Sequence, residues 1–112
     1  MQKKSLQNPA TLAQFEARAV VAKALAHPTR LFLLDVLAEG ERCVCELTEM
    51  VGADISTVSK HLSLLKNAGI VEVEKRGLMV FYRLRCPCIL NIFSCVEGVL
   101  KKNAARSQEA LR

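Results

Sequence analysis

The chain has 112 residues, of which 51% are hydrophobic, and carries a formal net charge of +5. This length suits one domain with a modest core, and because no Ser-His-Asp, paired-carboxylate or phosphate-loop pattern stands out, we expect a protein that is not an enzyme. The sequence has no run of about 18 apolar residues that could cross a membrane. Its amino terminus, MQKKSLQNPA, lacks the apolar segment of a signal peptide. We therefore expect a single cytoplasmic domain over residues 1–112.

The first third of the chain predicts two helices. After the polar residues 1–9, which we expect to form a flexible start, apolar residues recur at helical spacing from Ala10 to Ala26. His27-Pro28 ends this helix because proline disfavours helical geometry in the residue before it, and we interpret His27 as a structural residue. The next helix covers Thr29–Ala38. In it, Arg30 is better suited to capping a neighbouring helix than to meeting a phosphate.

Two further helices are arranged as a helix-turn-helix. A short helix over Glu46–Val51 is joined through Gly52 to an amphipathic helix within Asp54–Val71, which Asp54 can cap at its start and Asn67-Ala68-Gly69 can stop. One side of this helix carries an apolar stripe of Ile55, Val58, Leu62 and Leu65. The other side carries small or basic residues, with no carboxylate among them, that can reach phosphates or base edges: Ser56, Thr57, Ser59, Lys60 and Ser63.

A hairpin follows the helix pair. Strand-like runs over Ile70–Lys75 and Met79–Arg85 are joined at Arg76-Gly77-Leu78, which predicts a wing. Residues 56–85 carry six basic and two acidic side chains, whereas residues 1–55 carry six and seven. The basic surplus therefore lies where phosphates would be bound. We expect Arg76, at the tip, to contact phosphates or the minor groove, and we assign His61 to packing or to a phosphate contact.

The last predicted helix covers residues 86–106 and has a broader apolar face than a peripheral helix of so small a domain needs. We expect a partner chain to cover that face. The remaining end, residues 107–112, is polar and expected to be flexible.

The five cysteines form two close pairs and one single residue. Their odd number and a reducing compartment favour free thiols, metal ligands or redox sensing. Cys43-Val44-Cys45 begins the first helix of the helix-turn-helix, where a helix N-terminus lowers thiol pKa and thiolates suit soft ions. Residues two apart in a regular helix point about 200° apart. We therefore expect one ion to bind both sulfurs only if that turn unwinds, which would release the DNA-binding helix.

Cys86-Pro87-Cys88 lies where the wing ends and the last helix starts, and Cys95 follows seven residues later. If Cys88 and Cys95 share one helix, they stand roughly 10 Å apart along its axis, too far for one ion. A second site must then use Cys86 with Cys88, or join Cys95 to another element or chain. Cys95 also borders the apolar stripe, so a buried inert thiol is an alternative.

Three segments carry a family resemblance: LAHPTRLFLLDVLAEGERCVCEL (Leu25–Leu47), STVSKHLSLLKNAGIV (Ser56–Val71) and GLMVFYRL (Gly77–Leu84). Their order and spacing resemble those of the ArsR/SmtB family of metal- and metalloid-sensing repressors. The resemblance implies a mostly α fold with a small β-hairpin, a winged helix-turn-helix that dimerises through its first and last helices. It also implies a repressor that leaves its operator when an inducer binds. Two recognition helices about one DNA turn apart would read an inverted repeat in double-stranded DNA.

Cys-Val-Cys followed by an acidic residue and Leu47 is similar to the inducer motif of the arsenic-sensing branch. The resemblance implies trivalent arsenic or antimony as inducer, with zinc or cadmium as further candidates, and Cys43 and Cys45 as primary ligands. The third cysteine of that motif is replaced here by Thr48. Cys86, Cys88 and Cys95 are therefore candidate additional ligands, and two sulfurs with solvent are the other arrangement.

Two other functions compete with this interpretation. One is a repressor that senses thiol oxidation or sulfide, in which a disulfide replaces the ion. The other is a protein-interaction module in which the two Cys-x-Cys pairs form a structural zinc site.

Overall fold

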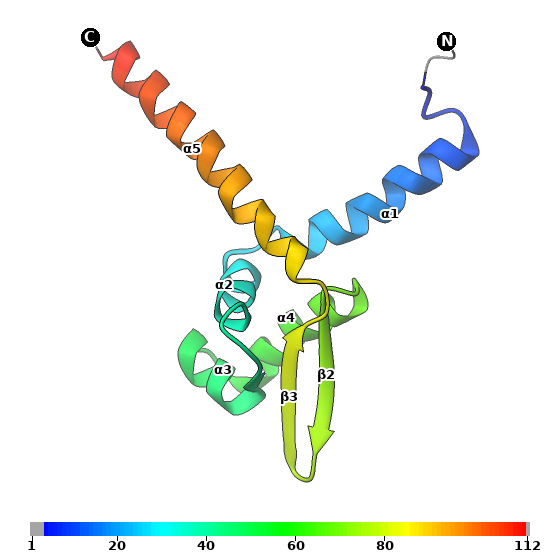
Figure 1. The fold of residues 1–112 in the computed structure, drawn as a ribbon, viewed down its shortest axis with the longest axis vertical. Helices are drawn as coiled ribbons and strands as arrows, with labels where there is room; N and C mark the ends of the chain where they lie inside the picture. The colour runs from blue at the N-terminus through cyan, green and yellow to red at the C-terminus, as the bar shows by residue number, and fades with distance from the viewer. Residues whose placement is uncertain (1–3, 112) are drawn as a thin grey trace.

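The computed structural model describes residues 4–111, and the elements are arranged as a body with two helical arms and a projecting hairpin (Figure 1). The element order is α1 (Pro9–Leu25), α2 (Pro28–Leu37), β1 (Arg42–Cys43), α3 (Val44–Val51), α4 (Ile55–Asn67), β2 (Val71–Arg76), β3 (Met79–Leu84), the 3-10 helix η1 (Pro87–Leu90) and α5 (Asn91–Ala110).

The helix boundaries differ from the prediction at both ends of the chain. α1 begins at Pro9 because the side chain of Asn8 accepts a hydrogen bond from the backbone N–H of Ala10, at 2.9 Å, and caps the first turn. The predicted last helix is divided, since residues 87–90 form a 3-10 turn before α5 starts. α5 then runs to Ala110, through four of the six residues expected to form a flexible end. Residues 1–3 and 112 of the two expected ends lie outside the described residues.

The sheet has three antiparallel strands in the order β1-β3-β2. The predicted hairpin is therefore only part of the sheet, which has one strand more. β2 and β3 pair as expected, with Glu74 opposite Phe81, and Gly77 takes a positive φ of 61° at the tip. The strand that sequence analysis missed, β1, has only two residues and pairs Cys43 with Phe81. A strand of two residues is too short to show an alternation of apolar and polar side chains, and its partner strand is distant in sequence.

The core lies where α2, α3 and α4 meet the sheet. Its fully buried side chains are Leu33, Leu34, Leu47, Val58, Leu62 and Leu65. Three members of the predicted α4 stripe are thus confirmed. The fourth is wrong: Ile55 is 56% exposed, because it is the first residue of α4 and lies one turn before Val58, where the buried part of the helix begins.

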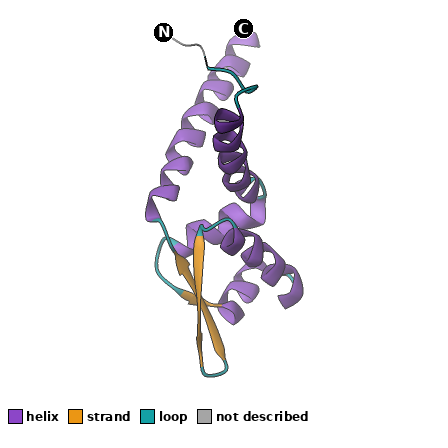
Figure 2. Cartoon of the chain, turned by 90° about the vertical axis from the view of Figure 1, so that its right-hand side faces the viewer, coloured by secondary structure: helices purple, strands orange, loops and turns teal. Residues whose placement is uncertain are grey.

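The two arms bury little within one chain. α1 buries only Ala24 and Leu25, at its body end, and no residue of α5 is buried. Both arms project from the body on the side opposite the hairpin tip (Figure 2). Large apolar side chains remain exposed along them: Leu12, Phe15, Val20, Val96, Val99 and Leu100. No helix within residues 4–111 is long and apolar enough to cross a bilayer.

Candidate nucleic-acid interface and thiol sites

The turn between α3 and α4 fixes the start of the candidate DNA-reading helix. Gly52 ends α3 with a φ of 77° and donates its N–H to the carbonyl of Thr48 at 3.0 Å. Asp54 caps α4 by accepting the N–H of Thr57 at 3.2 Å, and it also accepts the hydroxyl of Ser56 at 3.0 Å. Hydrogen bonds from Thr57 and Ser56 lower the pKa of Asp54, so the cap stays charged near neutral pH.

The exposed polar face of α4 consists of Ser56, Thr57, Lys60 and Ser63. These residues lie on one side of the helix because their spacing returns them to within about 60° of Lys60 at 100° per residue. Ser59 is half-buried beside them. Small side chains around one lysine allow a groove wall to approach the helix closely.

His61, assigned from the sequence to packing or to a phosphate contact, lies beside this face rather than on it. It is half-buried, with its ring centroid 4.3 Å from that of His27 and its Nδ1 3.3 Å from Nη1 of Arg30. Burial lowers the pKa of His61, and the neighbouring His27 and Arg30 lower it further, so the neutral ring is favoured. Packing, the other assignment for His61, agrees with this placement. The structural role predicted for His27 is confirmed, because its Nδ1 caps α2 by accepting the N–H of Thr29 at 3.1 Å.

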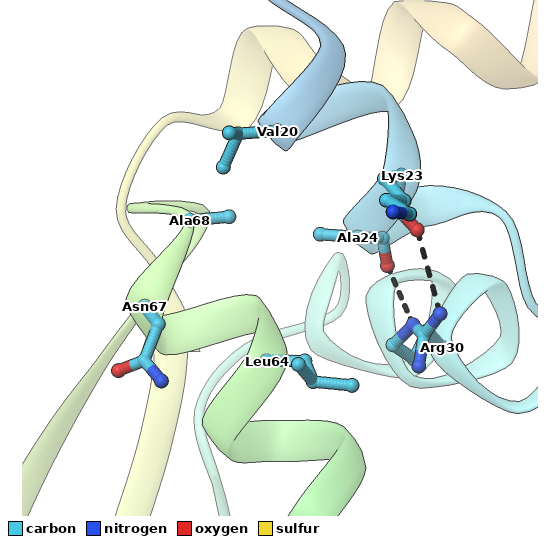
Figure 3. A pocket seen from close by; sticks show the side chains of 7 residues that line it. All are labelled: Val20, Lys23, Ala24, Arg30, Leu64, Asn67 and Ala68. Carbon is cyan, nitrogen blue, oxygen red and sulfur yellow. Dashed lines mark hydrogen bonds between the residues drawn. The ribbon is translucent and has the colours of Figure 1, made fainter. Parts of the chain in front are cut away.

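Arg30 caps α1, as the sequence predicts. Its Nε donates to the carbonyl of Ala24 at 2.7 Å and its Nη2 to the carbonyl of Lys23 at 3.4 Å (Figure 3). These residues line a cavity of about 440 Å³ between α1, α2 and α4, whose other lining residues are Val20, Leu64, Asn67 and Ala68. Arg30 therefore ties the α1 arm to the body beside the carboxyl end of α4.

Arg76 is engaged with carboxylates of its own chain. Its Nη1 donates to Glu41 at 2.5 Å and its Nε to Glu74 at 2.6 Å, while its guanidinium lies 4.6 Å from the centroid of the Phe81 ring. The bond from Arg76 lowers the pKa of Glu41. A DNA contact by Arg76 therefore requires exchange of these partners. Sequence reasoning missed Glu41, which lies 35 residues from Arg76.

Arg83 is paired in the same way. Its Nε donates to Glu72 at 3.1 Å, and its Nη1 lies 3.7 Å from a carboxylate oxygen of Glu74. Two of the four basic residues of the predicted wing, Arg76 and Arg83, are therefore paired with carboxylates of the same chain. Within the described residues, Lys60 has no such ion pair and remains available to a phosphate.

Cys43 and Cys45 are joined by a disulfide, with their Cα atoms 5.4 Å apart. The predicted conflict between joint use of these sulfurs and a regular helix is wrong, because α3 begins at Val44 and Cys43 has extended backbone, with φ −77° and ψ 156°. Cys43 is 2% exposed and Cys45 is exposed. Cys43 also caps α3, since its Sγ accepts the N–H of Glu46 at 3.4 Å while Glu46 accepts the N–H of Cys43.

No third ligand joins this pair within residues 4–111, where the structure gathers no group of three His, Cys, Asp or Glu side chains positioned for a metal. Thr48, at the third position of the arsenic motif, donates its hydroxyl to the carbonyl of Val44 at 2.7 Å. Two converging sulfurs nevertheless fit a soft ion that accepts further ligands from solvent or a partner chain.

The second cysteine pair lies at the junction of wing and arm. Sγ of Cys86 is 2.7 Å from Sγ of Cys88, and both residues are exposed. Hydrogen bonding to Cys86 raises the pKa of Cys88. Cys88 belongs to η1, so the common helix predicted for Cys88 and Cys95 does not form. Cys95 is exposed rather than buried within this chain.

Helices α3 and α4 followed by the β2–β3 hairpin define a winged helix-turn-helix domain. A homodimeric winged helix-turn-helix DNA-binding domain from Mycobacterium bovis has this fold, with a TM-score of 0.70 and 34% identity over 91% of this chain and 92% of that one. The profile described as bacterial regulatory protein, arsR family, matches residues 27–73. An arsenic resistance transcriptional regulator of Pseudomonas putida is 37% identical over 83% of this chain and 74% of its own length. The chain belongs to the arsR family of bacterial regulatory proteins, which agrees with the expectation that it is not an enzyme.

Other relatives differ in length and in the ion for which they are named. An HTH-type transcriptional regulator of Mycobacterium tuberculosis is 37% identical over 78% of this chain, which spans 38% of that longer protein. A homolog of the cadmium resistance regulatory protein, from Staphylococcus aureus, is 42% identical over 70% of this chain and 60% of its own length. Relatives of this chain are thus named for different ions, and an inducer must be argued from the ligands of each chain.

Proposed function

We propose that this protein is a homodimeric transcriptional repressor that binds an inverted-repeat operator through α4 and is released when trivalent arsenic or antimony binds Cys43 and Cys45. The observation that carries the DNA-binding part is the exposed polar face of α4, with Lys60 among small hydroxyl side chains. In this proposal α4 enters the major groove, Ser56, Thr57, Lys60 and Ser63 contact phosphates or base edges, and Ser59 lies at the margin. Arg76 adds a contact only after exchanging its carboxylate partners.

The homodimer is supported by the apolar side chains left exposed on α1 and α5. Large apolar side chains left exposed along two helices are typical of a surface that binds another protein chain. The Mycobacterium bovis domain of the same fold is homodimeric. A two-fold dimer would present two α4 helices to the same face of DNA, which an inverted repeat matches.

The inducer part rests on the position of Cys43, where three elements meet. Cys43 ends β1, caps α3 and pairs with Phe81 of β3. An ion shared with Cys45 pulls on the α3 cap and on the sheet together, without unwinding α3. Because α3 packs against α4, a shift of the cap changes the position and orientation of the DNA-reading helix. The reduced thiols that this requires fit the cytoplasmic location expected from the sequence.

A second candidate function is a repressor that responds to thiol oxidation. The disulfide between Cys43 and Cys45 favours it, since these two sulfurs bond to each other in the same place where an ion would bind. Ion binding and oxidation exclude each other, because a disulfide has no thiolate to offer. The same pair can therefore be tested for both in one protein.

The test begins with a duplex selected by the wild-type protein from a random-sequence library, because the operator is unidentified. Fluorescence anisotropy then follows release from that duplex as arsenite, antimonite, cadmium, zinc or peroxide is added. We expect arsenite and antimonite to release the reduced wild type, and Cys43→Ser and Cys45→Ser each to bind the duplex but resist release. Release by peroxide and not by arsenite would support the oxidation candidate instead.

The single variants Cys86→Ser, Cys88→Ser and Cys95→Ser complete the series. We expect them to shift the inducer dose at most. Full arsenite response in Cys43→Ser and Cys45→Ser, with loss in Cys86→Ser or Cys88→Ser, would make the wing-arm junction the primary site and refute the assignment. Zinc retained through purification, with no duplex enriched in the selection, would favour a zinc-stabilised interaction module.

A further inference from the structure

We propose that Cys86 and Cys88 form a second site, independent of Cys43 and Cys45, in which both sulfurs bind one trivalent arsenical. The two residues lie between the end of β3 and the start of α5, a junction that can be followed in Figure 1, and both are exposed. It does not depend on the operator-binding function, because the inference uses only the geometry and chemistry of the two thiols.

The backbone holds the two sulfurs together. Cys86 is extended, with φ −132° and ψ 94°, and Pro87 then starts the 3-10 turn. The N–H of Ile89 closes that turn on the carbonyl of Cys86 at 3.1 Å. Two sulfurs bound to one central atom at about 2.3 Å each must lie within about 4 Å of each other. The separation of 2.7 Å between the two Sγ atoms lies within this limit and needs only a small widening.

The two cysteine pairs cannot share an ion within one chain. Cys43 lies opposite Phe81 in the sheet, and extended pairing continues to Arg85, whose N–H donates to the carbonyl of Ile70 at 3.0 Å. Four residues of strand span about 13 Å, and Cys86 lies beyond them. Cys95 lies in α5, past the end of η1, and within residues 4–111 no third His, Cys, Asp or Glu side chain joins a pair to form a metal-holding group. The site therefore has two thiols.

Two thiols suit a trivalent arsenical better than zinc. Structural zinc takes four protein ligands in nearly all cases, and this junction offers two. An arsenical that carries one organic group has only two positions left to fill. With phenylarsine oxide, two As–S bonds form, the As–O bond breaks, and the two thiol protons leave with that oxygen as one water molecule. With arsenous acid, two As–OH groups leave as two water molecules. Arsenic stays trivalent throughout, so no oxidant or reductant is needed.

The hydrogen bond between the two thiols is compatible with this exchange. Neither sulfur needs to be uncovered first, because both residues are exposed. Cys43, by contrast, is buried.

The test titrates the reduced, folded protein with phenylarsine oxide and reads the intact mass. We expect two adducts on the wild type, one for each pair, and one on the Cys43→Ser/Cys45→Ser variant. In that background, adding Cys86→Ser or Cys88→Ser should remove the remaining adduct, and Cys95→Ser should leave it. Excess glutathione should not displace the arsenical, whereas 2,3-dimercaptopropanol should. An adduct that is absent from the double variant, or lost on Cys95→Ser, would overturn the site.

A second measurement separates a formed site from the reactivity of any Cys-Pro-Cys segment. Competition with 2,3-dimercaptopropanol is repeated on the Cys43→Ser/Cys45→Ser variant in denaturing urea. Because the fold holds the two sulfurs in place, we expect the folded protein to retain the arsenical about tenfold more tightly than the unfolded chain. Equal retention would refute a pre-formed site. No DNA is present in either measurement, so failure here is distinct from failure of the repressor proposal.

Discussion

Replacing Lys60 with alanine tests whether α4 reads DNA. Lys60 is exposed on the polar face of α4 and has no ion pair within residues 4–111. Its removal takes nothing from the core, so the thermal midpoint of the dimer should stay nearly unchanged. If Lys60 contacts one phosphate in each protomer, the variant releases fewer counterions on binding.

The size of this effect follows from counterion release. Each phosphate contact contributes about 0.9 to the slope of log affinity against log salt, so Lys60→Ala should lower the slope of a dimer by about 1.8. Over a fourfold rise in salt concentration, the wild type should therefore lose about tenfold more affinity than the variant.

Anisotropy titrations of the selected duplex at several salt concentrations measure this slope. Lys66→Ala is the matched control, because Lys66 is exposed on the same helix but about 120° around its axis from Lys60. An unchanged slope in Lys60→Ala, an equal change in Lys66→Ala, or a large loss of thermal stability in Lys60→Ala would refute the reading of α4 as the DNA-contacting helix.

Three further predictions follow from contacts described above. The free energy of unfolding of the wild type should fall as pH drops below 6.5, because folding lowers the pKa of His61 and the unfolded chain therefore protonates His61 at a higher pH than the folded protein does. Urea denaturation on either side of this pH should show a smaller fall in His61→Gln. The salt slope should change little in Arg76→Ala. It should steepen by up to about 0.9 per protomer in Glu41→Gln, which removes one of the two carboxylates that hold Arg76. Equal slopes in all three proteins would exclude the wing from DNA. Thr48→Cys should lower the arsenite concentration needed for release in the anisotropy assay, because residue 48 lies on the same side of α3 as Cys45; an unchanged dose would exclude that position as a ligand site.

Local patterns in the sequence were enough for much of the fold. The spacing of Val58, Leu62 and Leu65 located the buried side of α4, and proline after His27 located the break between α1 and α2. The capping role preferred for Arg30 over a phosphate contact is confirmed by its bond to the carbonyl of Ala24. Each of these features depends on residues within a few turns of one another.

The misplaced features depend on pairing across the chain or on an exact helix start. β1 forms only because Arg42 and Cys43 pair with Tyr82 and Phe81 of β3. With Cys43 in that strand, α3 begins at Val44, two residues before the predicted Glu46, and only Cys45 of the pair is helical. Arg76 is held by Glu41, and no helical or strand period relates positions so far apart.

The exposed arms affect the stability of the protein at low concentration. α5 has 20 residues, none of them buried, and most helical stability in proteins comes from packing of an apolar face against a neighbour. Packing against a second chain must then stabilise α5. Formation of the helix is therefore coupled by mass action to association of the two chains. Melting temperature should rise with protein concentration, and dilution should loosen the arms before it disturbs the body. At low copy number, operator DNA that gathers two chains would also act as a scaffold for completing their fold.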